Sequence, residues 1–167
     1  MAWYVCSVAL HILAACVWIG GMVFLALAVL PVLRRPAYQA VAVPLIHALG
    51  LRFRWIGWAA LATLVATGVV NLSYRGIGWA QVRTGAAWQG WFGHVLALKL
   101  VLVALILVAA GAHDLLLGPL ATRLANEHPD PARVRRIRRG AAWAGRGLLL
   151  LSVAVLVLGV MLVRGVP

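Results

Sequence analysis

Apolar residues in this chain gather into four long runs, separated by short stretches that contain arginine. The runs cover about residues 3–33, 55–74, 91–120 and 141–163. Each reaches the roughly 20 residues that a helix needs to cross the hydrocarbon core of a bilayer. We therefore predict an all-α integral membrane protein, a four-transmembrane-helix bundle that forms one transmembrane domain over residues 1–167.

The ends of the helices are marked by proline and arginine. The first run stops at a cluster of four such residues, Pro31, Arg34, Arg35 and Pro36. Asp130-Pro131 predicts the start of the last helix, because a capping residue followed by proline is typical of a first helical turn. The segment 37–50 is apolar but short and contains Pro44, so we expect an interfacial helix or a packed loop there.

Small residues inside the runs predict helices that approach one another closely. They are Gly20, Gly21, Gly57, Ala60, Ala141 and Gly145. Cys6 and Cys16 are ten residues apart in one run, which is about 15 Å along a helix and too far for a disulfide between them. We expect both to be small residues of the membrane core.

The composition also indicates a membrane protein, and it affects how the high positive net charge is interpreted. The chain is 65% hydrophobic, and a soluble domain of 167 residues could not bury so much apolar surface in one core. The net charge of +12 comes from arginines placed between the apolar runs rather than in an aromatic-lined groove. That placement is the topology signal of a membrane protein, so we do not expect a nucleic-acid partner.

Arginine counts predict the orientation. Residues 34–54 contain four arginines and residues 121–140 contain six, against two in residues 75–90. By the positive-inside rule, 34–54 and 121–140 are cytoplasmic loops and both termini lie outside, in a bacterial cytoplasmic (inner) membrane. Tryptophans mark the outer boundary (Trp3, Trp79, Trp88, Trp91) and the inner one (Trp55, Trp58, Trp143). No signal-peptide pattern opens the chain, so we expect the first helix to stay in the mature protein.

Two ionisable residues inside the apolar runs predict a functional site, because such groups are costly in a membrane. His11 lies 23 residues before Arg34, and Lys99, the single lysine, lies 24 residues before Arg123. Regular helices would place both at one level in the outer half. Thr63, Thr67 and Asn71 form a polar stripe at spacing four that rises toward this level, and Trp18 shares the face of His11.

Simpler roles stay open for these residues. Lys99 could extend its stem through lipid to the outer interface, and His11 could be an interhelical hydrogen-bond partner. His94 stands near the outer boundary, about 140° around the helix from Lys99, which favours an interfacial role over metal binding. His113 could form a second, inner site with His47, or an interfacial pair with Asp114.

Several enzyme classes are excluded by missing motifs. The chain has no Gly-rich phosphate loop, GxSxG, HExxH or CxxC. Its three acidic residues disfavour paired-carboxylate catalysis and binding of hard cations. Membrane redox chemistry is the enzymatic class that stays open.

Three segments resemble a known family. LHILAACVWIGGMVFLALAVLPVLRR, RFRWIGWAALATLVATGVVNL and LALKLVLVALILVAAGAHD resemble the first three helices of CopD-type membrane proteins (copper resistance protein D domain). The same superfamily includes the HemJ-type protoporphyrinogen oxidases, where a first-helix histidine and a third-helix lysine are associated with heme b. The resemblance implies those roles for His11 and Lys99. After the first helix the oxidases' Arg-Leu-Phe-Val-Tyr-His run is replaced by LPVLRRPAY, so the resemblance implies the cofactor rather than the oxidase activity.

Three functions follow as hypotheses. The first is a heme b protein with a redox or heme-linked role, in which His11 is an axial ligand and Lys99 is the second ligand or pairs with a propionate. A ligating Lys99 must be neutral, which burial in hydrocarbon favours. The second is a copper permease for copper homeostasis that uses His11, His94 and Met161. The third is a small structural subunit of a respiratory membrane complex, with other membrane redox proteins or further copies of the chain as partners.

Overall fold

The computed structural model describes residues 1–117 and 131–165, and over these ranges it consists of helices and turns without a strand. Four helical segments within them are long and apolar enough to cross a membrane: Ala2–Leu33, Pro36–Ser73, Gly90–Leu115 and Ala142–Arg164. The prediction of an all-α chain with four helices long and apolar enough to span a membrane is confirmed for the described residues. The chain divides into two compact units, Met1–Ala87 and Trp88–Pro167, which are described separately below.

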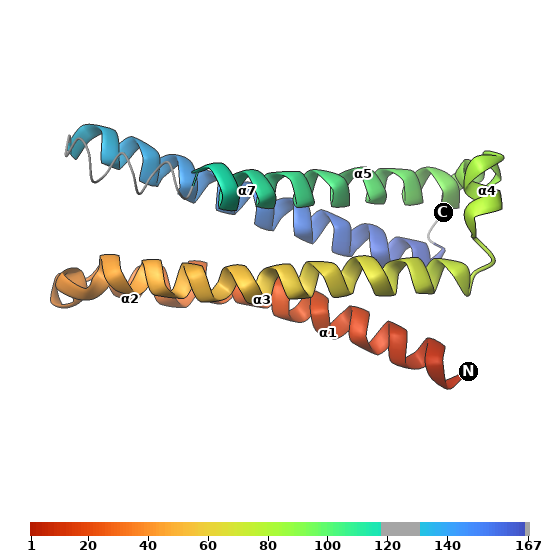
Figure 1. Cartoon of the computed structure of the whole chain (residues 1–167), viewed down its shortest axis with the longest axis horizontal. Helices are drawn as coiled ribbons and strands as arrows, with labels where there is room; N and C mark the ends of the chain where they lie inside the picture. The colour runs from red at the N-terminus through yellow and green to blue at the C-terminus, as the bar shows by residue number, and fades with distance from the viewer. Residues whose placement is uncertain (118–130, 166–167) are drawn as a thin grey trace. The chain divides into compact units, whose positions relative to one another are not determined.

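The first spanning segment is continuous but changes its winding near its end. It comprises α1 (Ala2–Phe24), a π-helical turn η1 (Leu25–Val29) and α2 (Leu30–Leu33) (Figure 1). Pro31 lacks an N–H group, and its ring would collide with a carbonyl of a regular α-helix. The wider turn just before it, closed by the bond from the Leu30 N–H to the Leu25 carbonyl, relieves that conflict. Pro36 holds Arg35 in an extended conformation (φ −69°, ψ 142°), so the segment ends where the sequence predicts.

The second spanning helix is much longer than predicted. After a 3₁₀ turn η2 (Pro36–Tyr38), α3 runs from Gln39 to Ser73 over 35 residues, about 52 Å (Figure 1). The predictions of a separate interfacial element at 37–50, a loop through residue 54 and a helix start at 55 are therefore wrong. Pro44 is the sixth residue of α3. The first four N–H groups of a helix have no partner inside it, so Pro44 lies just past that turn and removes the bond to the Ala40 carbonyl, yet α3 continues through it.

α1 and α3 pack antiparallel through aromatic rings set against glycines. The ring of Trp18 is stacked on that of Phe53 at a centroid distance of 6.0 Å. A Cβ on Gly57 would lie 2.8 Å from Cζ3 of Trp18, and a Cβ on Gly21 would overlap the Phe53 ring. Gly21, Gly57 and the buried Ala60 lie in the α1–α3 contact, but aromatic rings rather than a facing backbone fill the space beside the two glycines. Gly20 and Gly145 have no such neighbour within 4 Å among the described residues, so the prediction is wrong for these two.

The connection between the second and third spanning helices contains two short helices that the sequence did not predict. They are α4 (Trp79–Arg83) and η3 (Ala86–Trp88), each reached through a glycine with positive φ, Gly76 at 75° and Gly85 at 82°. The side-chain oxygen of Gln81 accepts the N–H of Gly78 at 2.9 Å and closes the first turn of α4. Positive φ strongly favours glycine, which explains the sharp turns at these points.

The second unit is built from α5 (Gly90–Ala112), a π-helical turn η4 (His113–Leu117) and α7 (Pro131–Arg164). The start of the last helix at Pro131 is confirmed, while Asp130 and residues 118–120 of the predicted third helix lie outside the described residues. α5 packs on α7 along a mainly aliphatic seam that buries Leu96, Ile106, Ser152 and Leu162. At the start of α5, a Cβ on Gly93 would overlap the backbone of Trp88.

Candidate functional site

His11 and Thr67 meet between α1 and α3. The Nδ1 atom of His11 lies 2.8 Å from the hydroxyl oxygen of Thr67, and the pair is partly buried. Thr67 itself is 9% exposed. The polar stripe predicted on the second spanning helix therefore reaches the first-helix histidine, as the sequence indicated, and Thr67 is the member that touches it.

The hydrogen bonds of Thr67 decide which nitrogen of the neutral His11 ring carries the proton. The Thr67 hydroxyl donates its single hydrogen to the Thr63 carbonyl oxygen at 2.6 Å, one turn earlier in α3. It can then only accept from His11, so Nδ1 bears the hydrogen. The lone pair of the ring is consequently on Nε2, as it is in most metal-binding histidines that donate their other N–H to a neighbour.

Further polar atoms extend this contact into a layer. Ser7, one turn before His11, is 8% exposed and donates to the backbone carbonyl of Thr67 at 3.5 Å. Asn71 lies one turn beyond Thr67, and its Oδ1 is buried without a hydrogen-bond donor among the described residues. An unpaired buried acceptor costs about 1–3 kcal/mol, so it marks a place where a ligand or a polar partner would be stabilised. Ser7, His11, Thr67 and Asn71 are called the polar layer below.

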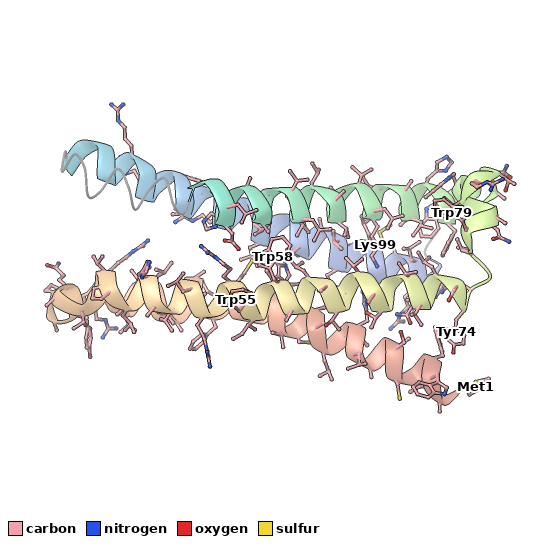
Figure 2. All side chains as sticks on the ribbon, viewed as in Figure 1. Met1, Trp55, Trp58, Tyr74, Trp79 and Lys99 are labelled. Atoms are coloured by element: carbon pink, nitrogen blue, oxygen red, sulfur yellow. The ribbon has the colours of Figure 1, made fainter. Side chains whose placement is uncertain are left out.

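Ser7 and Gly68 belong to this site and were missed by sequence reasoning. A Cβ on Gly68 would lie in ordinary contact with the His11 ring, 3.6 Å from its Cε1. Ser7 stands four residues before His11, so helical spacing alone could have identified it. At the same end of this unit, the rings of Tyr4 and Tyr74 are 5.3 Å apart and line, with Met1, an open hollow of about 400 Å³ (Figure 2).

Trp18 shares the His11 face of α1, as predicted, but its contacts are with other residues. Its ring is 6% exposed and lies against Gly57 and Phe53. Gly57 precedes Thr67 by ten residues of α3, about 15 Å along the helix axis. In the first unit Trp18 therefore fixes the register of α1 on α3, and through that register the meeting of His11 with Thr67.

Lys99 lies in the second unit and reaches toward α7 (Figure 2). Its Nζ would be 3.3 Å from a Cβ placed on Gly159, so the missing side chain of that glycine leaves room for the amine. The amine thus lies at the α5–α7 seam, beside the backbone of the neighbouring helix. His11 and Lys99 belong to different units, and a common level for them stays a prediction.

The remaining histidines named from the sequence are less enclosed. His47 on α3 and His94 on α5 are exposed. His113 pairs with Asp114 through an Nδ1–Oδ1 distance of 3.0 Å, in line with the predicted His-Asp pair. In residues 1–117 and 131–165, no three His, Cys, Asp or Glu side chains come together in a group that could hold a metal ion.

Comparison with known protein families gives one match. Residues 13–130 match the domain of unknown function DUF4149, which is more than half of the chain. The chain belongs to the DUF4149 family. The matched region includes α3, α5, Trp18, Thr67, Asn71 and Lys99, and it begins two residues after His11. Searches of curated proteins and of solved structures found no match.

Proposed function

We propose that this DUF4149 protein binds one heme b through His11 and has a redox or heme-linked role in the membrane. The observation that carries the proposal is the hydrogen bond between His11 Nδ1 and Thr67, because it directs the lone pair of the ring to Nε2. An axial histidine of a heme needs that arrangement, a neutral ring held in one tautomer by a neighbour. The resemblance of the first three helices to CopD-type and HemJ-type proteins supports the same assignment.

The residues around His11 fit an axial ligand. The ring is oriented by Thr67 and has a glycine beside it at Gly68, and Asn71, whose Oδ1 is buried without a donor among the described residues, lies one turn from Thr67 in α3. Lys99 is proposed as the second ligand or as the partner of a propionate. When bound, heme b supplies one-electron chemistry. The chain holds the ligand ring in place, and the apolar surface of the helices keeps water away from it.

The orientation is proposed from the arginines. The two arginine-rich regions, 34–54 and 121–140, are placed on the cytoplasmic side of a bacterial inner membrane, and both termini outside. The long α3 changes this picture only in that much of the first region continues the membrane helix. A reporter enzyme that folds only outside the cytoplasm, fused after Pro167, should be active; an inactive fusion of normal abundance would reverse the topology.

The proposal is tested by the absorption spectrum of the full-length protein purified in detergent after expression with added heme. We expect a Soret band for the wild type, its loss in His11→Ala, and its retention in His94→Ala. His94 is the matched control because it is an exposed histidine on α5 and is not one of the four residues of the polar layer. A wild type without a Soret band, or equal loss in both variants, would refute heme binding at His11.

The two other hypotheses predict different results in the same preparation. A copper permease would contain copper that His11→Ala removes, without a visible chromophore. A structural subunit would copurify with partner proteins and would keep its function in His11→Ala. Cu(I) prefers soft sulfur ligands. Cys6 and Cys16 are ten residues apart on α1, about 15 Å, so their thiols cannot bind one copper ion together, and we favour the heme hypothesis.

A further inference from the structure

Arginines at the start of the last spanning helix lie on the same face as its exposed apolar residues. Arg136, Arg139, Trp143 and Arg146 follow one another at spacings of three, four and three, and all four are exposed. Continuing the same spacing leads to Leu150, Val153, Val157 and Val160, which are 70%, 40%, 51% and 53% exposed. These eight residues form one continuous stripe along α7, called the α7 stripe below.

The opposite face of α7 packs on α5. Ser152 and Leu162 are buried there, and Gly159 lies beside Lys99 of α5. The α7 stripe therefore points away from the helix partner within its unit. The aliphatic part of the stripe lies within the apolar span Ala142–Arg164. The stripe changes from aliphatic residues to arginine at Arg146, near the first residue of that span, and this end of a spanning helix is where the lipid head groups begin.

Arg146 and Trp143 are joined at this level. The guanidinium carbon of Arg146 lies 4.8 Å from the centroid of the Trp143 ring, a cation–π contact. Tryptophan and arginine side chains prefer the head-group region, where one end of the side chain is apolar and the other meets water and phosphate. Arg139 is seven residues away, about 10 Å along the axis, so the two long side chains can reach across one layer of head groups.

The acidic residues of the chain are too few to neutralise its cations. The chain has fifteen Lys and Arg residues against three Asp and Glu, so at least twelve cations need an anion from outside. Of the three acidic residues, Asp114 pairs with His113, while Glu127 and Asp130 lie outside the described residues. Among the described residues, neither Arg139 nor Arg146 forms an ion pair or hydrogen bond. Phosphate is matched to the guanidinium group in both charge and geometry.

We propose that the arginine end of the α7 stripe binds the head group of an anionic phospholipid. Arg139 and Arg146 contact its phosphate, Trp143 holds Arg146 at head-group depth, and Leu150 and Val153 lie along its acyl chain. This assignment is independent of the heme proposal, since it rests on α7 alone. Each arginine near an anionic surface strengthens binding about fivefold.

The test is native mass spectrometry of the full-length protein released from detergent micelles that contain phosphatidylglycerol and phosphatidylcholine. We expect the wild type to retain phosphatidylglycerol preferentially, and Arg139→Gln/Arg146→Gln to lose about 25-fold of that preference. Arg164→Gln is the matched control, because it removes the same charge from an exposed position at the other end of the same helix. It should leave the preference unchanged.

Thermal unfolding checks that the variants fold. The double variant Arg139→Lys/Arg146→Lys is a second test of lipid binding. The lysine variant keeps the charge and loses the planar fork, so its preference should fall between those of the wild type and the glutamine variant. A wild type without a preference for phosphatidylglycerol, or an Arg164→Gln variant as weak as the double variant, would overturn the proposal. The first result would point to a protein or a second copy of the chain on this surface.

Discussion

The two units of this protein use glycine in different ways. Between α1 and α3, aromatic rings lie in the space left by glycines, at Trp18 with Gly57 and Phe53 with Gly21. In the second unit the closest contact at a glycine is local, between Gly93 in the first turn of α5 and the backbone of Trp88 in η3, five residues earlier. A ring can rotate when a side chain is added beside it, whereas the backbone of a turn moves only if the turn is rebuilt, so the second contact should tolerate far less change.

The pairs also differ in polarity. The α1–α3 seam contains the polar layer, where a histidine is held by a hydroxyl of the opposite helix. In the α5–α7 seam the buried Ser152 donates from its Oγ to the Leu148 carbonyl oxygen of its own helix at 2.8 Å. The first contact joins two helices, and such interhelical polar contacts fix register and can orient a side chain. The intramembrane histidine His11 therefore lies in the first pair and the single lysine, Lys99, in the second.

The largest effect is expected from glycine substitutions that test the packing difference. Gly93→Ala should lower the free energy of unfolding by about 3 kcal/mol, the upper end for overpacking, because the new Cβ would overlap backbone atoms of Trp88. Gly57→Ala should cost less, about 1 kcal/mol, because the new Cβ would lie 2.8 Å from a ring atom of Trp18, and a side chain can move aside more easily than backbone. The measurement is unfolding of the purified variants in mixed micelles.

Gly20→Ala is the control for both glycine variants, because a Cβ there meets no described atom within 4 Å. Alanine favours the helix, so this variant should be at least as stable as the wild type. If Gly57→Ala lowered the free energy of unfolding more than Gly93→Ala did, the idea that a ring adjusts to an added Cβ more easily than backbone does would be wrong for this protein.

An intermediate effect is expected at Lys99. Lys99→Arg places a wider, permanently charged group against Gly159 and offers no lone pair, whereas Lys99→Met is apolar and can ligate through sulfur. We expect Lys99→Arg to lose or shift the heme spectrum more than Lys99→Met, measured per mole of folded protein. The unfolding cost should also be larger for arginine, at about 1–2 kcal/mol.

Identical spectra for the two Lys99 variants and the wild type would show that Lys99 is not an iron ligand. Equal stability of Lys99→Arg and the wild type would further support the alternative in which the side chain extends to the interface, since arginine reaches the interface equally well. The two measurements therefore separate a ligand from a cation that only packs.

Much of the fold follows from local signals, and the errors have local causes. The apolar runs predict all four spanning segments, and Pro36 predicts the end of the first. The predicted boundary at 54 is wrong because arginine is a good helix former and does not end α3 at Arg52 or Arg54. Pro44 does not end it either, because the apolar residues on both sides continue one helix over 35 residues.

The site was predicted in part, for a different reason. Helical spacing placed His11 and Trp18 on one face of the first helix and Thr67 in a stripe on the second. Which of Thr63, Thr67 and Asn71 meets His11 depends on the register between α1 and α3. That register is set by the turn at Arg34–Tyr38 and by rings packed on glycines, which are non-local properties that spacing along one helix does not contain.

The smallest effect concerns the two hydroxyl groups that distinguish the seams. Thr67→Val leaves the His11 N–H without its acceptor and should cost about 0.6–1.7 kcal/mol, the range for interhelical hydrogen bonds in membranes. Ser152→Ala removes the bond from its Oγ to the Leu148 carbonyl oxygen of the same helix, and loss of that bond should cost no more than about 0.5 kcal/mol. Both are measured by unfolding in the same micelles as the glycine variants.

A double-mutant cycle attributes the Thr67 effect to its partner. If the hydroxyl acts through His11, Thr67→Val should cost much less in a His11→Ala background, because the N–H that needs an acceptor is gone. Ser152→Ala should cost the same in both backgrounds, since it belongs to the other unit. An unchanged Thr67→Val cost would mean that the hydroxyl stabilises α3 through the Thr63 carbonyl alone. The tautomer argument for His11 would then lose its energetic support.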